Sequence, residues 1–179
     1  MAEVDKGISV GRANGDVHVR VAGRGTFQNG QPLRRYAVEM IGQGVRQFVV
    51  DLGACEGMDS TFLGVLAGIG LQLHDPAKCG RVRLANVSPR NLELLQTLGL
   101  DRLFEINPPA DLAAIELQRL PDSDFAKSQL PSTKHETANL MLEAHDNLVR
   151  VDDRNQARFK DVTAILRERA AKAANDKTN

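Results

Sequence analysis

Asp59, Ser60 and Thr61 form an acidic and hydroxyl-bearing triplet between two apolar parts of the chain. The run QFVVDL lies shortly before this triplet, and the apolar segment FLGVLAGIGLQL follows it directly. Asp and Ser are favoured at helix N-caps, because their side-chain oxygens accept hydrogen bonds from the first N–H groups of a helix. A structural cap worth about 1 kcal/mol is therefore the simplest interpretation of the triplet.

Two further kinds of chemistry are open to Ser60. A serine nucleophile needs a base, but no histidine lies near Ser60 in the sequence. The elbow motif G-x-S-x-G is absent, since Met58 and Phe62 stand where its glycines would be. A phosphate on Ser60 would instead be stabilised by the free N–H groups and the dipole of a helix N-terminus. Its charge of about −1.5 to −2 would change any partner surface built around the serine.

The bulk composition argues against several classes of function. The chain of 179 residues has 23 Lys and Arg and 23 Asp and Glu, and this balance disfavours broad binding to nucleic acid or anionic membranes. It has no run of about 18 apolar residues and no signal-peptide core, so we expect a cytoplasmic protein without a membrane segment. The two cysteines and four histidines are scattered along the chain, and no Walker-type motif is present. We therefore expect neither a metal nor a cofactor.

Hydrophobic periodicity predicts an α/β domain over about residues 7–106. Alternating valines beside Asn14-Gly15 predict a β-hairpin at residues 7–22. Further strands are expected at 46–52, 80–87 and 102–106, and helices are expected to begin at Pro32, at Ser60 and, after the N-cap Ser88, at Pro89. The order β-β-α-β-α-β-α-β implies right-handed crossovers and a largely parallel sheet.

Three residues close to the triplet have more than one interpretation. Gly64 and Gly68 would let the backbone of their helix approach a neighbour closely, and packing on the sheet is the expected use. Asp51 ends a predicted strand, where it is either a solvated terminus or a residue that positions Ser60.

The chain changes character after Asn107. A short helical pattern and a polar linker are followed by a second helical region, which opens at Thr133 with the spacing of a capping box to Glu136. The helical pattern continues to about Ala174, and one continuous helix and a broken helical hairpin fit it equally well. We therefore divide the chain into a domain at 1–110, a short helix and linker at 111–132, and a helical C-terminal extension at 133–179.

The helical extension carries an apolar stripe that needs a cover. Its members are Met141, Leu148, Val151, Phe159, Val162 and Ile165. Each side chain contributes roughly 1.5–3 kcal/mol when it is fully buried. The stripe could fold back on the domain, pair with a second copy or dock on a partner, and we favour the first two, which include a homodimer through the C-terminal helices.

Three strings resemble the STAS domains of the anti-sigma-factor-antagonist family. They are VRVAGRGTFQNGQPLRRYAVEMI, FVVDLGACEGMDSTFLGVLAGI, with its Asp-Ser pair before a glycine-containing helix, and VRLANVSPRNLELLQTLGLDRLFEI. The resemblance covers about residues 7–106 and leaves out the helical extension. It implies a STAS-like mixed, mostly parallel sheet with helices, to which the C-terminal helices are added.

The resemblance also implies a function without enzymatic activity. In that family the serine of the Asp-Ser pair is phosphorylated by a serine-protein kinase that is also an anti-sigma factor. The unphosphorylated antagonist binds this kinase, and a serine phosphatase restores binding after phosphorylation. Transferred to this chain, Ser60 is the phosphoacceptor, and Asp59, Thr61 and Phe62 are the partner-binding residues around it. Phe62 departs from the pattern, because Gly or Ala is common at that position.

A scaffold is the alternative function. The same STAS domain would then assemble with other copies or with a signalling complex through its C-terminal helices, and no phosphorylation switch would be involved.

Overall fold

The computed structural model describes residues 6–108, 118–119 and 134–175. Its strands are β1 (Gly7–Ala13), β2 (Asp16–Gly25), β3 (Gln47–Asp51), β4 (Cys55–Met58), β5 (Arg81–Ala85), β6 (Glu105–Ile106) and β7 (Gln118–Arg119). Its helices are α1 (Phe27–Gly42), α2 (Ser60–Leu73), α3 (Pro89–Thr97), the 3₁₀ turn η1 (Leu100–Arg102), α5 (Lys134–Val151) and α6 (Arg154–Asn175). The strand order is β6-β5-β3-β2-β1-β7, and β4 pairs with β2 outside this path.

The predicted mixed, mostly parallel sheet is confirmed. β1 and β2 form the expected antiparallel hairpin, in which Asn14 and Gly15 both have positive φ angles, of 55° and 87°. Such angles suit the two-residue turns that match strand twist. From β2 onward the main ladder is parallel, with Val50 of β3 opposite Val19 of β2 and Leu84 of β5.

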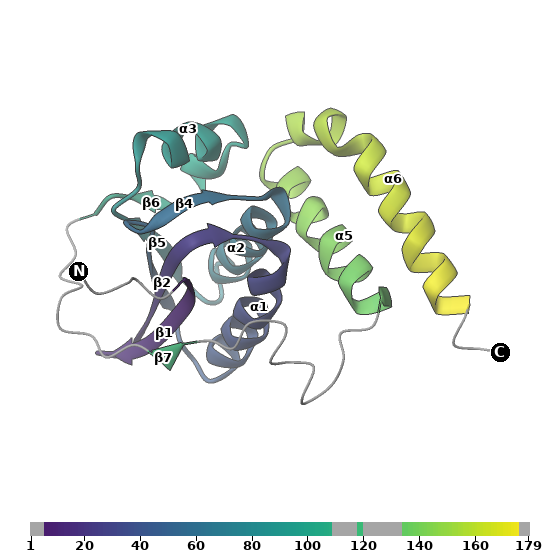
Figure 1. Cartoon of the computed structure of the whole chain (residues 1–179). Helices are drawn as coiled ribbons and strands as arrows, with labels where there is room; N and C mark the ends of the chain where they lie inside the picture. The colour runs from purple at the N-terminus through teal and green to yellow at the C-terminus, as the bar shows by residue number, and fades with distance from the viewer. Residues whose placement is uncertain (1–5, 109–117, 120–133, 176–179) are drawn as a thin grey trace.

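Helices α1 and α2 lie beside the sheet and form the main core with it (Figure 1). The valines of β2 at positions 17, 19 and 21 are all buried, as the alternating pattern predicts. Most of α2 is buried, because the core lies on one side of it and further helices lie on the others. Its apolar residues on nearly every face are explained by these several neighbours.

Two sequence-based predictions in this region are wrong. Helix α1 begins at Phe27, five residues before Pro32, which lies inside the helix. The early start is stabilised by the side chain of Asn29, which accepts a hydrogen bond from Thr26 N–H at 2.8 Å. The loop before Asp59 also contains a short strand, β4, which the sequence pattern did not indicate. Its backbone pairs with the end of β2 after a shift in register.

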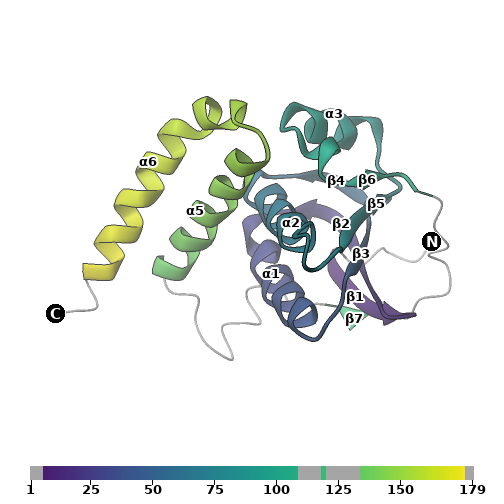
Figure 2. The same cartoon turned by 180° about the vertical axis from the view of Figure 1, so that it is seen from behind.

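The C-terminal extension is a helical hairpin and not one continuous helix. Helix α5 contacts both α2 and α6, and Figures 1 and 2 show it lying between them. The break comes at Asp152, whose carboxylate accepts a hydrogen bond from Arg154 N–H at 3.0 Å. An Asp that bonds the first N–H groups favours a new helix start even without Gly or Pro. Thr133 and most of the predicted short helix before it lie outside the described residues, and the helix prediction is wrong for Gln118–Arg119, which form β7 and pair with β1.

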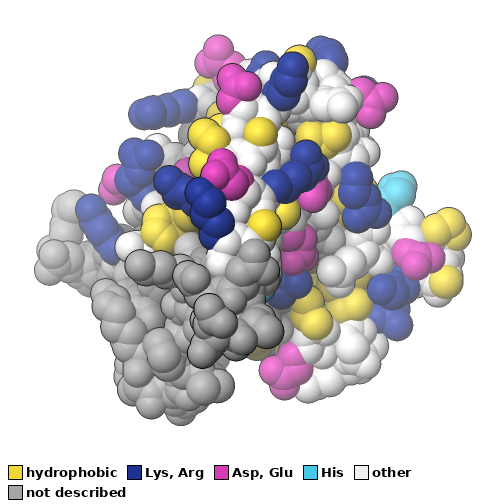
Figure 3. Space-filling view, turned by 90° about the vertical axis from the view of Figure 1, so that its right-hand side faces the viewer, with side chains coloured by type: hydrophobic (Ala, Val, Ile, Leu, Met, Phe, Trp, Pro, Cys, Tyr) yellow, Lys and Arg dark blue, Asp and Glu magenta, His cyan; other side chains and the backbone are white. Residues whose placement is uncertain are grey.

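The predicted apolar stripe is covered unevenly. Leu148 on α5 is fully buried, whereas Val162 and Ile165 on α6 are 42% and 52% exposed. This difference arises because α5 is enclosed between α2 and α6, and α6 is the outermost helix. Figure 3 views the molecule from the side of α6 and shows hydrophobic side chains interspersed with charged ones.

No helix within residues 6–108 or 134–175 is long and apolar enough to span a membrane. The division of the chain near residue 110 stays a prediction.

Candidate functional site

Asp59 joins the amino ends of the two helices that lie on the sheet. Its Oδ1 atom accepts a hydrogen bond from Phe62 N–H in α2 at 2.8 Å, and its Oδ2 atom accepts one from Phe27 N–H in α1 at 2.9 Å. The Asp59 N–H donates to the carbonyl of Gly25 at 2.9 Å, which fixes the residue to the end of β2. Two positive helix-dipole ends therefore meet at one carboxylate, with Ser60 directly beside it.

The Ser60 hydroxyl makes a hydrogen bond to a histidine of the C-terminal hairpin. Ser60 Oγ lies 3.1 Å from Nε2 of His145, and Nδ1 of the same ring lies 2.7 Å from the carbonyl oxygen of Met141. A carbonyl oxygen only accepts, so a neutral ring carries its proton on Nδ1. Nε2 is then the acceptor, and Ser60 donates its hydroxyl proton to it.

The His145 ring is enclosed within the hairpin. The residue is 4% exposed, and its ring packs in a T-shaped arrangement with that of Phe159 of α6, with the ring centroids 4.9 Å apart. Sequence reasoning did not single out His145, which lies 85 residues from Ser60. The usable signal was its position between Met141 and Leu148, two members of the predicted apolar stripe.

Helices α2 and α5 approach each other until their backbones are in contact. A Cβ atom at Gly64 would overlap the carbonyl group of Ala144, and one at Gly68 would come within 2.5 Å of the Asn147 amide nitrogen. The Asn147 amide also donates to the Gly64 carbonyl at 3.3 Å. The expectation that these glycines serve packing on the sheet is therefore wrong, since their close neighbour is α5.

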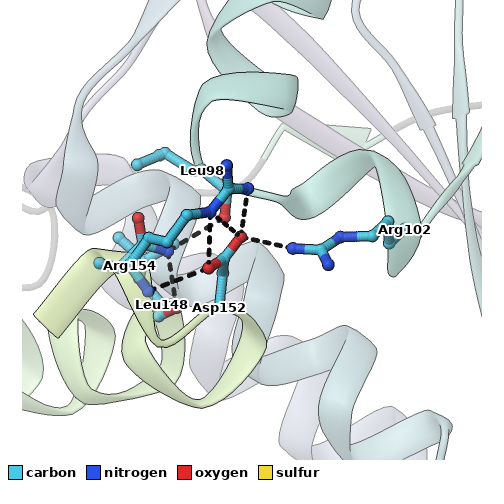
Figure 4. Close-up of polar contacts among 6 residues, drawn as sticks. Leu98, Arg102, Leu148, Asp152 and Arg154 are labelled. Carbon is cyan, nitrogen blue, oxygen red and sulfur yellow. Dashed lines mark hydrogen bonds and ion pairs between the residues drawn. The ribbon is translucent and has the colours of Figure 1, made fainter.

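The turn between α5 and α6 is attached to the domain by polar contacts (Figure 4). Asp152 pairs with Arg102 of η1 and with Arg154, and Asn155 donates to the carbonyls of Leu98 at 3.0 Å and Leu148 at 2.8 Å. The hydrogen bonds from Arg154, reinforced by the charges of both arginines, hold the pKa of Asp152 well below its usual range.

The carboxylate of Asp51 bonds to residues other than Ser60. Its carboxylate accepts hydrogen bonds from Asn86 at 2.9 Å and Gly53 N–H at 3.0 Å, and it pairs with Arg20 at 3.1 Å. Burial alone would raise the pKa of Asp51, but these donors outweigh it and hold the pKa below its ordinary value. The residue thus links the carboxyl ends of neighbouring strands.

The four residues predicted to form the site differ in exposure. Asp59 and Ser60 are half-buried, whereas Thr61 is 6% exposed and Phe62 is fully buried. The ring of Phe62 occupies space above Gly25, where an added Cβ would come within 2.5 Å of the ring. The bulky residue at the start of α2 is thus accommodated by a glycine at the end of β2.

The fold and the site define a mixed α/β domain that presents a serine at the amino end of a helix. Residues 8–106 match the family described as "Mlab, STAS domain", so the chain belongs to the STAS family. The comparison with curated proteins found no match.

Two similar solved structures are antagonists by their descriptions. The unphosphorylated anti-sigma factor antagonist SpoIIAA is 21% identical, with a TM-score of 0.50 over 57% of this chain and 89% of its own. A putative anti-sigma factor antagonist from Thermotoga maritima is 17% identical, with a TM-score of 0.51 over 57% of this chain and 86% of its own. Both likenesses show the fold, and both cover little more than the STAS domain.

The double cap made by Asp59 leads to a prediction about stability. Asp59→Ala leaves the first N–H groups of α1 and α2 without their carboxylate, and each lost cap costs about 1 kcal/mol. We expect the free energy of unfolding to fall by about 2 kcal/mol in urea titrations followed by circular dichroism. Ser88→Ala, which removes the single cap of α3, is the matched control and should cost about half as much. Equal losses for the two variants would contradict the double role of Asp59.

Proposed function

We propose that this STAS protein is a phosphorylation-controlled, cytoplasmic anti-sigma-factor antagonist. Unphosphorylated, it binds an anti-sigma factor that is also a serine kinase, and phosphorylation of Ser60 ends the binding until a serine phosphatase reverses it. The observation that carries the proposal is the place of Ser60, at the amino end of α2 and next to a carboxylate that caps two helices. Family membership and the antagonist fold of the similar structures support the same role.

The electrostatics of this position suit a switch. The amino ends of α1 and α2, where the helix dipoles are positive, favour an added anion at Ser60. The same phosphate stands beside the Asp59 carboxylate, and together they form a concentrated negative charge. A partner surface that accepts the neutral serine would meet this charge at close range, where like charges cost several kcal/mol.

A hydrolase is the competing function, because the hydrogen bond from Ser60 to His145 resembles that of a nucleophile and its base. The surroundings argue against it. The base, His145, belongs to the hairpin, and it is 4% exposed and packs against the ring of Phe159. Removal of the hairpin to admit a substrate would also remove the base from the serine. With the hairpin docked, a substrate cannot reach the Ser60–His145 pair. With the hairpin removed, Ser60 has no base beside it.

Phosphosite mapping on the protein isolated from its native cells tests the proposal. We expect phosphate on Ser60 and its disappearance in a Ser60→Ala strain. Phosphate mapped only to Thr61 or elsewhere would contradict it. Labelling of Ser60 by a fluorophosphonate would favour the hydrolase.

The scaffold alternative predicts a different result in pull-downs. A scaffold keeps the same co-purifying proteins when Ser60 is replaced by Asp, whereas a switch loses its kinase. The outer side of α6, with Val162 and Ile165 exposed, is the surface that such an assembly or a homodimer would use.

A further inference from the structure

We propose that the α5–α6 hairpin is a displaceable cover over the amino end of α2, and that its docking and a phosphoryl group on Ser60 exclude each other. The role of Ser60 as phosphoacceptor rests on the function proposed above. The exclusion itself rests on the geometry between Ser60 and the hairpin.

The hydrogen bond between Ser60 and His145 is lost when the serine is phosphorylated. Transfer of the terminal phosphoryl group of a nucleoside triphosphate forms a bond from Oγ to phosphorus and breaks the bond from phosphorus to the nucleoside diphosphate. The hydroxyl proton, which Ser60 donates to Nε2 of His145, is released. An Oγ to Nε2 distance of 3.1 Å leaves no room for a phosphoryl group between the two atoms.

The docked hairpin cannot make room by a small shift. At Gly64 the backbone of α2 is already in contact with the carbonyl group of Ala144, and Asn147 is similarly close at Gly68. Packed helices of this kind have discrete arrangements and do not deform continuously. A phosphoryl group that lies toward His145 must therefore separate α5 from α2.

The interface between the hairpin and helices α1 and α2 combines apolar and polar contacts, as interfaces that open often do. Its large buried apolar residues on α5 are Leu140 and Leu148, and the other buried residues of α5 are the small Ala138 and Ala144 and the polar His145 and Asn147. Arg34 of α1 pairs with Glu143 at 2.8 Å, with the two side chains 39% and 41% exposed. Interfaces of this mixed character within one chain are typically the ones that move.

The cover also affects partner binding. A partner that must reach Ser60 competes with the hairpin, so its apparent affinity falls by the fraction of molecules in which the hairpin is open. The unphosphorylated chain is thus restrained by its own C-terminal helices.

Hydrogen exchange on the full chain tests the exclusion directly. Phosphoserine is placed at position 60 by amber-codon suppression, and amide exchange in α5 is compared with that of the unmodified chain by mass spectrometry. We expect exchange in residues 141–150 to become at least about tenfold faster, while the sheet stays protected. Ser60→Ala, which loses the hydrogen bond without adding bulk or charge, should give a smaller increase.

Two glycine substitutions, one as the test and one as its control, probe the docking of the hairpin without changing any charge. Gly64→Ala should open the hairpin because the new Cβ meets the Ala144 carbonyl, whereas Gly42→Ala in α1 should change nothing because its Cβ meets no atom within 4 Å. If amide exchange in the sheet also becomes faster in Gly64→Ala, the variant is unfolding as a whole. The test of the proposal is then the exchange measured on the phosphoserine chain. Unchanged protection of α5 in the phosphoserine chain would overturn the proposal. Absence of phosphate from Ser60 in cells would contradict only the proposed function.

Discussion

Ser60→Asp is expected to weaken binding to the proposed kinase partner by thirty- to a thousandfold. The estimate corresponds to about 2–4 kcal/mol, the cost of placing a like charge or an unpaired carboxylate in a close interface. Asp59 already carries a carboxylate there, so the substitution doubles the charge at one point of the surface. Titration calorimetry with the partner identified by pull-down measures the change.

Ser60→Ala is the matched control for this prediction. It removes the hydroxyl and its bond to His145 without adding charge. We therefore expect it to bind the partner at least as tightly as the unmodified chain does. If alanine weakened binding as much as aspartate, the hydroxyl would be a direct contact and charge would not be the cause.

Phe62→Ala is expected to lower the free energy of unfolding by about 3–5 kcal/mol, the largest effect on stability that we predict. The ring is fully buried at the start of α2, against Gly25 at the end of β2. Its removal leaves a cavity that the surrounding strands and helices cannot fill. Urea denaturation of the full chain measures the loss.

Gly25→Ala tests the same contact from the other side. Its Cβ would come within 2.5 Å of the Phe62 ring, and such overpacking typically costs about 1–3 kcal/mol. In the double variant Gly25→Ala with Phe62→Ala, the new methyl enters the vacated space, so the two losses should not add. Gly57→Ala, whose Cβ meets nothing within 4 Å, is the control. Strictly additive losses would contradict the proposed packing.

Several features of this chain follow from residues that lie close together in the sequence. Asn14-Gly15 specifies a two-residue turn with two positive φ angles, and Ser88 caps a helix that is followed by Gly99 at φ 72°. The cap by Asp59 on α2 was predictable for the same reason. These signals involve hydrogen bonds and dihedral angles within a few residues. The interacting groups are therefore neighbours in the sequence, and a local pattern is enough to predict them.

Which distant residues meet depends on how the helices and strands pack together. The start of α1 at Phe27 is stabilised by the nearby side chain of Asn29 and also by the carboxylate of Asp59, 32 residues away, which accepts a hydrogen bond from the Phe27 N–H. A continuous helix and a broken helical hairpin fitted the sequence of the C-terminal extension equally well, and the structure has the hairpin, with its break at Asp152. The ion pair between Asp152 and Arg102 forms only because the hairpin lies against the domain. Local sequence patterns could not predict the start of α1 or the break in the extension, because Asp59 and Arg102, which help to stabilise them, belong to other parts of the fold.

The site shows the same division most clearly. Sequence patterns alone singled out Ser60 and Asp59 as candidate site residues, because an acid and a hydroxyl before an apolar helix have few local uses. They identified Gly64 as a point of close approach without indicating the neighbour. Only the tertiary structure placed Ala144 against that glycine and His145 on the serine, since helical periodicity says which face of α5 is apolar and not what it covers.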